Sequence, residues 1–298
     1  MVKVKESIPE RIFSAFNYIL LTEIALLMLY PIVNIVAVSF SNYEAYLKEP
    51  WMIFPKDFTL EAYKLVFRNG YFWRSYMNTI IVTIASTALS LTVTLLFAWP
   101  MARKEIKGKP FFMAILIFTM VFNAGMIPNY LNMQDMNLLN TLWVLILPGA
   151  FNTFNCVIMM SFLRELPYEL VEAAMVDGGS EPYILRKIVV PLSKPVLASV
   201  TLFLAVGAWN SYFGAQIYIQ NRELWPIALT LKEILMAAST AILEAGADPA
   251  ALSAIGTEIE SKTIQYASVI ISTLPIMCVY PFLQKHFAKG VMVGSVKG

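Results

Sequence analysis

The chain has 298 residues, of which 58% are apolar and only 14% carry a charge. Soluble domains carry about 25% charged residues, so this composition excludes an ordinary water-exposed surface. The net charge of +2 argues against nucleic acid as a partner. The two cysteines, Cys156 and Cys278, lie in apolar stretches and have no disulfide-framework or metal-ligand spacing. Because the charges are clumped between long uncharged stretches, we predict an integral membrane protein.

A helix needs about 20 apolar residues to cross the hydrocarbon core of a bilayer. Six segments meet this requirement, at approximately residues 12–40, 75–102, 111–134, 141–163, 195–220 and 263–284. We therefore predict an all-α membrane protein with six transmembrane helices in a single domain. The only charge inside these segments is Glu23. An intramembrane charge is a functional candidate by default, but a partner across a subunit interface would explain it equally well.

The distribution of Lys and Arg predicts the orientation. They are concentrated before the first segment, in residues 103–110 and 164–194, and after the last segment. The positive-inside rule makes these parts and both termini cytoplasmic. The aromatic-rich residues 41–74 and the loop 221–262 then lie outside. In that loop we expect an amphipathic helix to about Met236, and then an Ala-rich segment whose acids exclude a seventh span: Glu244, Asp248, Glu258 and Glu260.

The cytoplasmic loop 164–194 reads as two short helices around a glycine corner. Pro167 suits the start of the first helix, and Gly178-Gly179 supply its stop. Ser180 is placed to cap the second helix, which we expect Pro191 to end. The loop is therefore predicted to form a compact projection on the inner surface.

The spacing of this loop resembles a known family. Glu172-Ala173-Ala174 is followed by three residues and Gly178, then by nine residues, Ile188, and Val190-Pro191. This resembles the EAA loop in permease subunits of ATP-binding-cassette (ABC) importers, with Val190 where the family usually has Leu. The Asp177-Gly178 pair and the run of residues 287–298 are similar to those of carbohydrate permeases of the MalG type.

The resemblance implies a type I (MetI-like) permease that pairs with a second, MalF-like permease. It also implies two cytoplasmic ATPase subunits and an extracytoplasmic solute-binding protein, in the bacterial cytoplasmic membrane. The solute-binding protein is expected near residues 237–262. The residues expected to couple to the ATPase are Glu172, Ala173, Ala174, Asp177, Gly178, Ile188 and Pro191. We find no GxxxxGK[ST] motif, so we expect ATP and Mg²⁺ on the partners, and no cofactor or metal on this chain.

The fifth segment carries a polar and aromatic stripe. At 100° per residue, Trp209, Tyr212, Gln216 and Gln220 share one helical face. Aromatic faces and amides suit a sugar, so we consider Trp209, Tyr212 and Gln216 as lining of a substrate pathway, with Asn210, Asn152 and Asn155 as weaker candidates. The equally good alternative is that these side chains hold helices together, as intramembrane amides commonly do.

Two other functions are alternatives to transport driven by ATP. An ion-coupled secondary transporter predicts internal repeats and several intramembrane carboxylates. A membrane-embedded enzyme predicts a cluster of reactive groups. The sequence indicates neither feature. It leaves open whether the sugar is neutral or acidic: no predicted span contains the Lys or Arg that would favour an acidic chain, but partner subunits could supply them.

Overall fold

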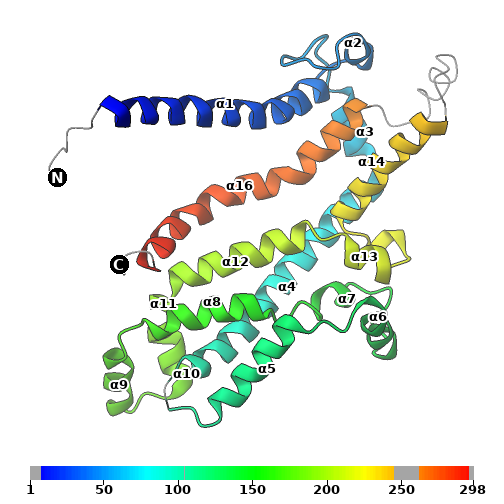
Figure 1. Ribbon diagram of the computed structural model, residues 1–298. Helices are drawn as coiled ribbons and strands as arrows, with labels where there is room; N and C mark the ends of the chain where they lie inside the picture. Colours follow the sequence, from blue (N-terminus) through cyan, green and yellow to red (C-terminus); the bar gives the residue numbers. More distant parts are fainter. Residues whose placement is uncertain (1–7, 104, 245–261, 295–298) are drawn as a thin grey trace. The chain divides into compact units, whose positions relative to one another are not determined.

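The computed structural model describes residues 8–103, 105–244 and 262–294 (Figure 1). Within these ranges the regular structure is entirely helical. The chain divides into two compact units, which are described separately. One comprises residues 1–69 and 233–271, and the other comprises residues 70–232 and 272–298. One boundary between the units falls between Asn69 and Gly70, and the other two fall inside helix α14 (Ile227–Glu244) and helix α16 (Lys262–Gly294).

The first unit begins with the long apolar helix α1 (Ile8–Ser39). Its most apolar window has a mean hydropathy of 2.1, and only 6% of that window is buried. Burial starts at the end of the helix, where Ala37 and Val38 pack with Met52. Helix α1 is therefore apolar on nearly its whole circumference, as expected for a segment surrounded by lipid or by partner subunits.

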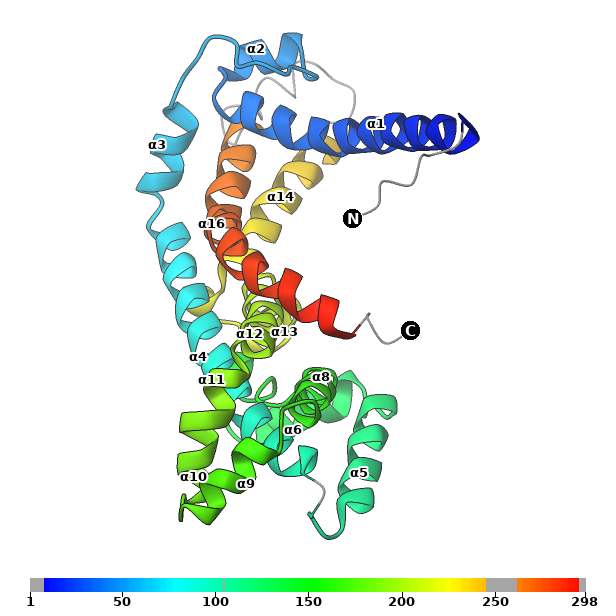
Figure 2. The same cartoon turned by 90° about the vertical axis from the view of Figure 1, so that its left-hand side faces the viewer.

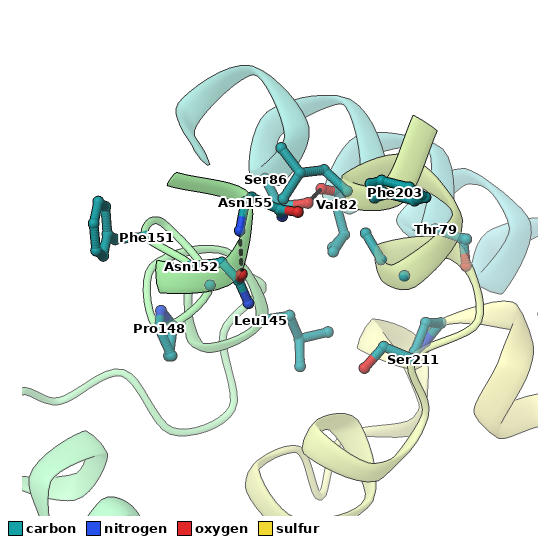
Figure 3. Close-up of a pocket in the computed structure, with 15 residues that line it drawn as sticks. Thr79, Val82, Ser86, Leu145, Pro148, Phe151, Asn152, Asn155, Phe203 and Ser211 are labelled. Carbon is teal, nitrogen blue, oxygen red and sulfur yellow. Dashed lines mark hydrogen bonds between the residues drawn. The ribbon is translucent and has the colours of Figure 1, made fainter. Parts of the chain in front are cut away.

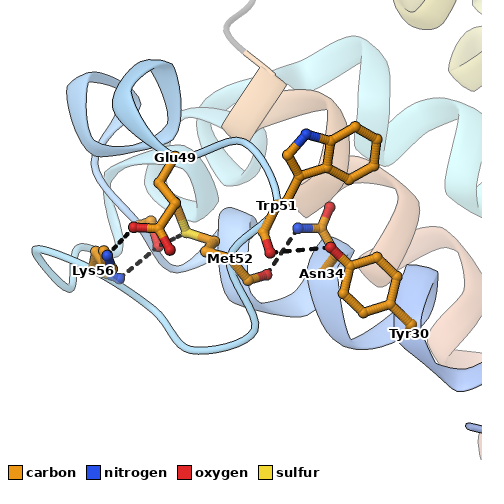
Figure 4. Close-up of polar contacts among 7 residues, drawn as sticks. Tyr30, Asn34, Glu49, Trp51, Met52 and Lys56 are labelled. Carbon is orange, nitrogen blue, oxygen red and sulfur yellow. Dashed lines mark hydrogen bonds and ion pairs between the residues drawn. The ribbon is translucent and has the colours of Figure 1, made fainter.

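The chain after α1 is tied back to that helix. Tyr30 Oη donates to the carbonyl oxygen of Trp51 at 3.0 Å. Asn34 Nδ2 donates to the carbonyl oxygens of Pro50 at 3.0 Å and Met52 at 2.8 Å (Figure 4). The two short helices of this region are α2 (Tyr43–Lys48) and α3 (Glu61–Arg68). The aromatic-rich stretch is thus an ordered substructure and not a loose loop.

The second unit is built on helix α4 (Gly70–Ala102), against which helices α8 (Thr153–Arg164) and α12 (Lys194–Trp209) pack (Figure 1). The shared core is apolar and contains Ala98, Met159, Met160 and Val200, all nearly inaccessible to solvent. Figure 2 shows α9 (Glu169–Val176) and α10 (Glu181–Ile184) at the end of this unit where α4 ends and α5 (Lys109–Val121) begins. This arrangement connects the loop of residues 164–194 directly to the main helix of the unit.

Several predicted spans are broken helices. Residues 111–134 form α5 (Lys109–Val121) and α6 (Met126–Asp135), which are bent by 113°. Residues 141–163 form α7 (Trp143–Ile146) and α8, and residues 195–220 form α12 and α13 (Phe213–Tyr218). Gly125, with a φ of 89°, explains the first break, because L side chains avoid that conformation. Apolar composition predicted the helical class correctly but did not predict where the helices are interrupted.

In the described residues, three helices are long and apolar enough to cross a membrane: Ile8–Ser39, Gly70–Ala102 and Lys262–Val279. The number rises to five if the pair α5 and α6, and the pair Glu181–Leu192 and Lys194–Trp209, each count as one span. The all-helical membrane fold is confirmed. The residue bounds of the six predicted spans remain predictions.

Two helix ends differ from the sequence prediction. Pro191 does not end the second helix of the 164–194 loop, since α10 continues through the π-helix η1 (Leu185–Val189) into α11 (Val190–Leu192). A π turn shifts the backbone hydrogen bonds by one residue, which helps accommodate a proline that has no N–H. Helix α14 runs to Glu244, beyond the expected end near Met236. Asp248, Glu258 and Glu260 lie outside the described residues.

Candidate coupling surface and translocation cavity

The corner between α9 and α10 requires both of its glycines. Gly178 has a φ of +82°, and its N–H donates to the carbonyl oxygen of Met175 at 3.0 Å. The Gly179 N–H donates to the carbonyl oxygen of Ala174 at 2.8 Å, so the two bonds close the end of α9 as a Schellman motif. A Cβ on Gly179 would lie 2.7 Å from that same Ala174 oxygen. The predicted helix, corner and helix are present, although the Ser180 side chain makes no capping hydrogen bond.

An open hollow of about 680 Å³ lies over this corner. Five of the predicted coupling residues line it: Ala173, Ala174, Asp177, Gly178 and Ile188. The exposed Glu172 and Pro191 do not. Leu170 and Tyr183 also line it and are exposed, and the neighbouring Val176 is 87% exposed. The motif reasoning missed these three apolar side chains. In the sequence, only Val176 carries a local signal, as an apolar residue next to the Asp177-Gly178 pair.

A cation that the sequence analysis did not single out holds the corner in place. Arg103, at the end of α4, pairs with Glu181, and its Nη2 lies 3.4 Å from Tyr168 Oη. The guanidinium also lies 5.7 Å from the ring centroid of Trp99. Burial opposes the charged form, but the hydrogen bonds to Glu181 and Tyr168 outweigh it, so the pKa of Arg103 is raised above its ordinary value. The last turn of α4 is therefore attached to both sides of the corner.

A cavity of about 380 Å³ lies between α4, the connection from α7 to α8, and α12 (Figure 3). Its polar lining consists of hydroxyl and amide groups, from Thr79, Ser86, Asn152, Asn155 and Ser211. The Asn152 side-chain oxygen accepts from the Asn155 backbone N–H at 3.0 Å, and so caps α8. Asn155 itself is only 6% exposed. A cavity lined by hydroxyls, amides and apolar side chains suits the surface of a sugar ring.

The predicted stripe on the fifth segment is not one helical face. Helix α12 ends at Trp209 with Asn210 as its C-cap, and α13 starts at Phe213. The calculation at 100° per residue therefore fails, and the expected alignment of Trp209 with Tyr212 and Gln216 was wrong. Gln220 lies beyond α13, where its backbone N–H donates to Asn140 Oδ1 at 2.6 Å.

Trp209 and Asn210 have local packing roles. The Trp209 indole Nε1 donates to the carbonyl oxygen of Ser272 at 3.0 Å, and its ring lies edge-on to Tyr76 with centroids 5.7 Å apart. It is 8% exposed and lines a small pocket of about 200 Å³ whose other lining residues are apolar except for Thr83. Asn210 Nδ2 donates to the carbonyl oxygen of Val206 at 3.0 Å. For these two residues, the geometry favours the helix-packing alternative over cavity lining.

Glu23 is exposed on α1, and no described residue forms an ion pair with it. Its role stays open.

The family described as "Binding-protein-dependent transport system inner membrane component" matches residues 105–293 of this chain. The chain belongs to this family. Protein LplC of Bacillus subtilis (strain 168) is 41% identical over 97% of this chain and 96% of the relative. The polygalacturonan/rhamnogalacturonan transport system permease protein YtcP of the same organism is 36% identical over 97% and 99%, respectively.

The fold has a solved counterpart. A chain in the crystal structure of a bacterial ABC transporter involved in the import of the acidic polysaccharide alginate has a TM-score of 0.84 and 35% identity. The match covers 96% of this chain and 100% of that one. The protein is thus a multi-pass permease subunit of an ABC importer and not itself an enzyme, and membership of the family implies ATPase and solute-binding partners.

Proposed function

We propose that this chain is one of two membrane subunits of an importer that uses ATP to carry an oligosaccharide into a bacterial cell. The observation that carries the proposal is the exposed hollow at the α9–α10 corner. Leu170, Val176 and Tyr183 present apolar surface there, beside the small side chains of Ala173 and Ala174. Exposed apolar patches on such a segment are typical of protein interfaces, and small residues allow a partner backbone to approach closely.

The partner at this hollow is the cytoplasmic ATPase. Glu172 offers it a charged hydrogen-bond acceptor, and Asp177, Ile188 and Pro191 extend the contact along both helices. ATP and Mg²⁺ belong to the ATPase subunits, and this chain binds no cofactor of its own. A second, MalF-like permease and an extracytoplasmic solute-binding protein complete the complex. Both termini of the chain are cytoplasmic, in keeping with the concentration of Lys and Arg.

The transmission route runs through α4. When the ATPase dimer closes on ATP, it displaces the corner, and the contact of Arg103 with Glu181 carries that displacement to the end of α4. The same helix contributes Thr79, Val82 and Ser86 to the cavity. Movement of one rigid helix therefore couples the inner surface to the cavity wall.

The substrate class is supported by the relatives. YtcP is named for polygalacturonan and rhamnogalacturonan, and the solved counterpart takes part in alginate import. The hydroxyl and amide lining of the cavity fits a carbohydrate. Asn152 and Asn155 are the amides of this chain that line the cavity directly.

Reconstitution of the complete complex in proteoliposomes tests this function. With the solute-binding protein outside and ATP inside, a labelled oligosaccharide should accumulate, and removal of ATP should abolish uptake. Uptake driven by a proton or sodium gradient without ATP would instead support a secondary transporter. Release of a chemically altered sugar without transport would support an enzyme.

A further inference from the structure

A lysine outside the predicted spans joins two of the predicted pathway residues. Lys232 lies on α14, and its ammonium donates to the Gln216 Oε1 atom on α13 at 2.7 Å. The same ammonium lies 4.6 Å from the ring centroid of Tyr212. Two contacts of different kinds, a hydrogen bond and a cation–π contact, therefore fix the charge beside the break between α12 and α13.

The helix that carries Lys232 is itself anchored to α4. The backbone N–H of Ile227 donates to Thr79 Oγ1 at 2.7 Å, and the hydroxyls of Thr230 and Ser75 lie 2.7 Å apart. Thr79 also lines the cavity, as do Pro226, at the approach to α14, and Ser211, which directly precedes Tyr212. The cluster of Tyr212, Gln216 and Lys232 is thus built onto the same framework as the cavity and begins one residue from its wall.

The polar groups of Gln216 and Lys232 that stay available to a ligand are hydrogen-bond donors. Because the Gln216 oxygen accepts from Lys232, the amide presents its two N–H groups, and the ammonium retains further N–H groups of its own. In the part of the chain that the structure describes, no carboxylate pairs with Lys232. By contrast, Arg74 is paired with Glu223 at 3.1 Å. Tyr212 is 39% exposed, so its ring is accessible to a sugar ring.

We infer that Tyr212, Gln216 and Lys232 form a site for the carboxylate of an acidic oligosaccharide, such as a uronic acid chain, beside the cavity. The inference rests on the proposed import function and specifies its substrate class. Donors from Lys232 and Gln216 bind the carboxylate, and Tyr212 packs against the sugar ring. Sugar hydroxyls both donate and accept, so a neutral chain gains less from a site made of donors. Lys232 is accordingly the residue that distinguishes acidic from neutral chains.

The test compares a galacturonic acid oligomer with the same oligomer after reduction of its carboxyl groups to alcohols. Uptake of each is measured in proteoliposomes that hold the assembled complex. The wild type should favour the acidic chain, and Lys232→Gln should lower its uptake roughly tenfold, the size expected for one charge-assisted hydrogen bond. Uptake of the reduced chain should stay unchanged. Lys232→Arg should retain the preference, and Lys64→Gln, which removes an exposed lysine distant in sequence, should behave as wild type.

Three results would overturn the site. They are no preference in the wild type, an unchanged preference in Lys232→Gln, and an equal loss of both substrates in that variant. The last would mean that Lys232 only supports the fold around Tyr212 and Gln216. These failures leave import itself intact. If the wild-type complex carried no carbohydrate at all, in contrast, the proposed function would fail together with the site.

Discussion

Arg103 and Glu181 form an ion pair between the end of α4 and the start of α10. Arg103 is mostly buried whereas Glu181 is largely exposed, so the pair lies at the edge of the packed helices and not in their core. The contact links the longest helix of its unit to the corner that we assign to the ATPase.

Breaking the Arg103–Glu181 ion pair should weaken the coupling of ATP hydrolysis to transport. Arg103→Gln removes the charge that holds Glu181 and the contact with Tyr168, so transport per ATP hydrolysed should fall several-fold while the helices still assemble. Because Glu181 is partly solvated, a double-mutant cycle with Glu181→Gln should give a coupling free energy of about 0.5–1.5 kcal/mol. Thermal unfolding in detergent measures that free energy, and proteoliposomes measure the coupling.

The control for this pair is Glu169→Gln, an exposed acid in the first turn of α9. It should leave coupling unchanged. Strictly additive effects of Arg103→Gln and Glu181→Gln would show that the two side chains do not act together.

The orientation can be tested by labelling single cysteines with a membrane-impermeant thiol reagent. A cysteine at the exposed position Lys107 should react only from the cytoplasmic face, because the positive-inside rule predicts that the basic loops lie there. One at the exposed position Lys64 should react only from the outside. The two native cysteines are first replaced by alanine. Reaction of the Lys107 position from outside would reverse the predicted topology.

Substitutions at Trp209 and at Asn155 should distinguish a residue that packs helices together from a residue that lines the substrate pathway. Trp209→Ala removes a buried ring and its hydrogen bond to Ser272, which costs about 3–5 kcal/mol for a buried tryptophan, so the amount of assembled complex should fall. Trp209→Phe should retain much more of it.

Asn155→Ala, at a residue that lines the cavity, should instead lower sugar uptake with assembly preserved. Complex yield and uptake are measured on the same preparations. Normal assembly but lost uptake in Trp209→Ala would restore Trp209 to the substrate pathway.

Sequence patterns predicted those features of the fold that depend on a few neighbouring residues. The long apolar stretches indicated helices throughout. Gly178-Gly179 predicted the corner, because glycine tolerates a positive φ and lets another part of the backbone approach closely. The prediction of continuous helices failed at breaks inside uncharged stretches, as between Trp209 and Phe213, where Asn210, Ser211 and Tyr212 separate α12 from α13. The role of Lys232 could not be predicted from the sequence, because its contacts with Tyr212 and Gln216 depend on how α14 is anchored to α4.

The central claim is that the α9–α10 corner transmits the conformational change of the ATPase to the membrane helices. A substitution at Gly178 tests this claim most directly. Gly178→Val places a β-branched side chain at a φ of +82°, which should distort the corner and leave the remote cavity unchanged. Gly178→Asn is the matched control, because Asn tolerates this conformation much better.

The measurement is the amount of ATPase bound to each purified complex, together with sugar transported per ATP hydrolysed in proteoliposomes. We expect Gly178→Val to lose ATPase or to hydrolyse ATP without transport, and Gly178→Asn to remain close to wild type. Full ATPase attachment with normally coupled transport in Gly178→Val would contradict the assignment of this corner as the transmission element.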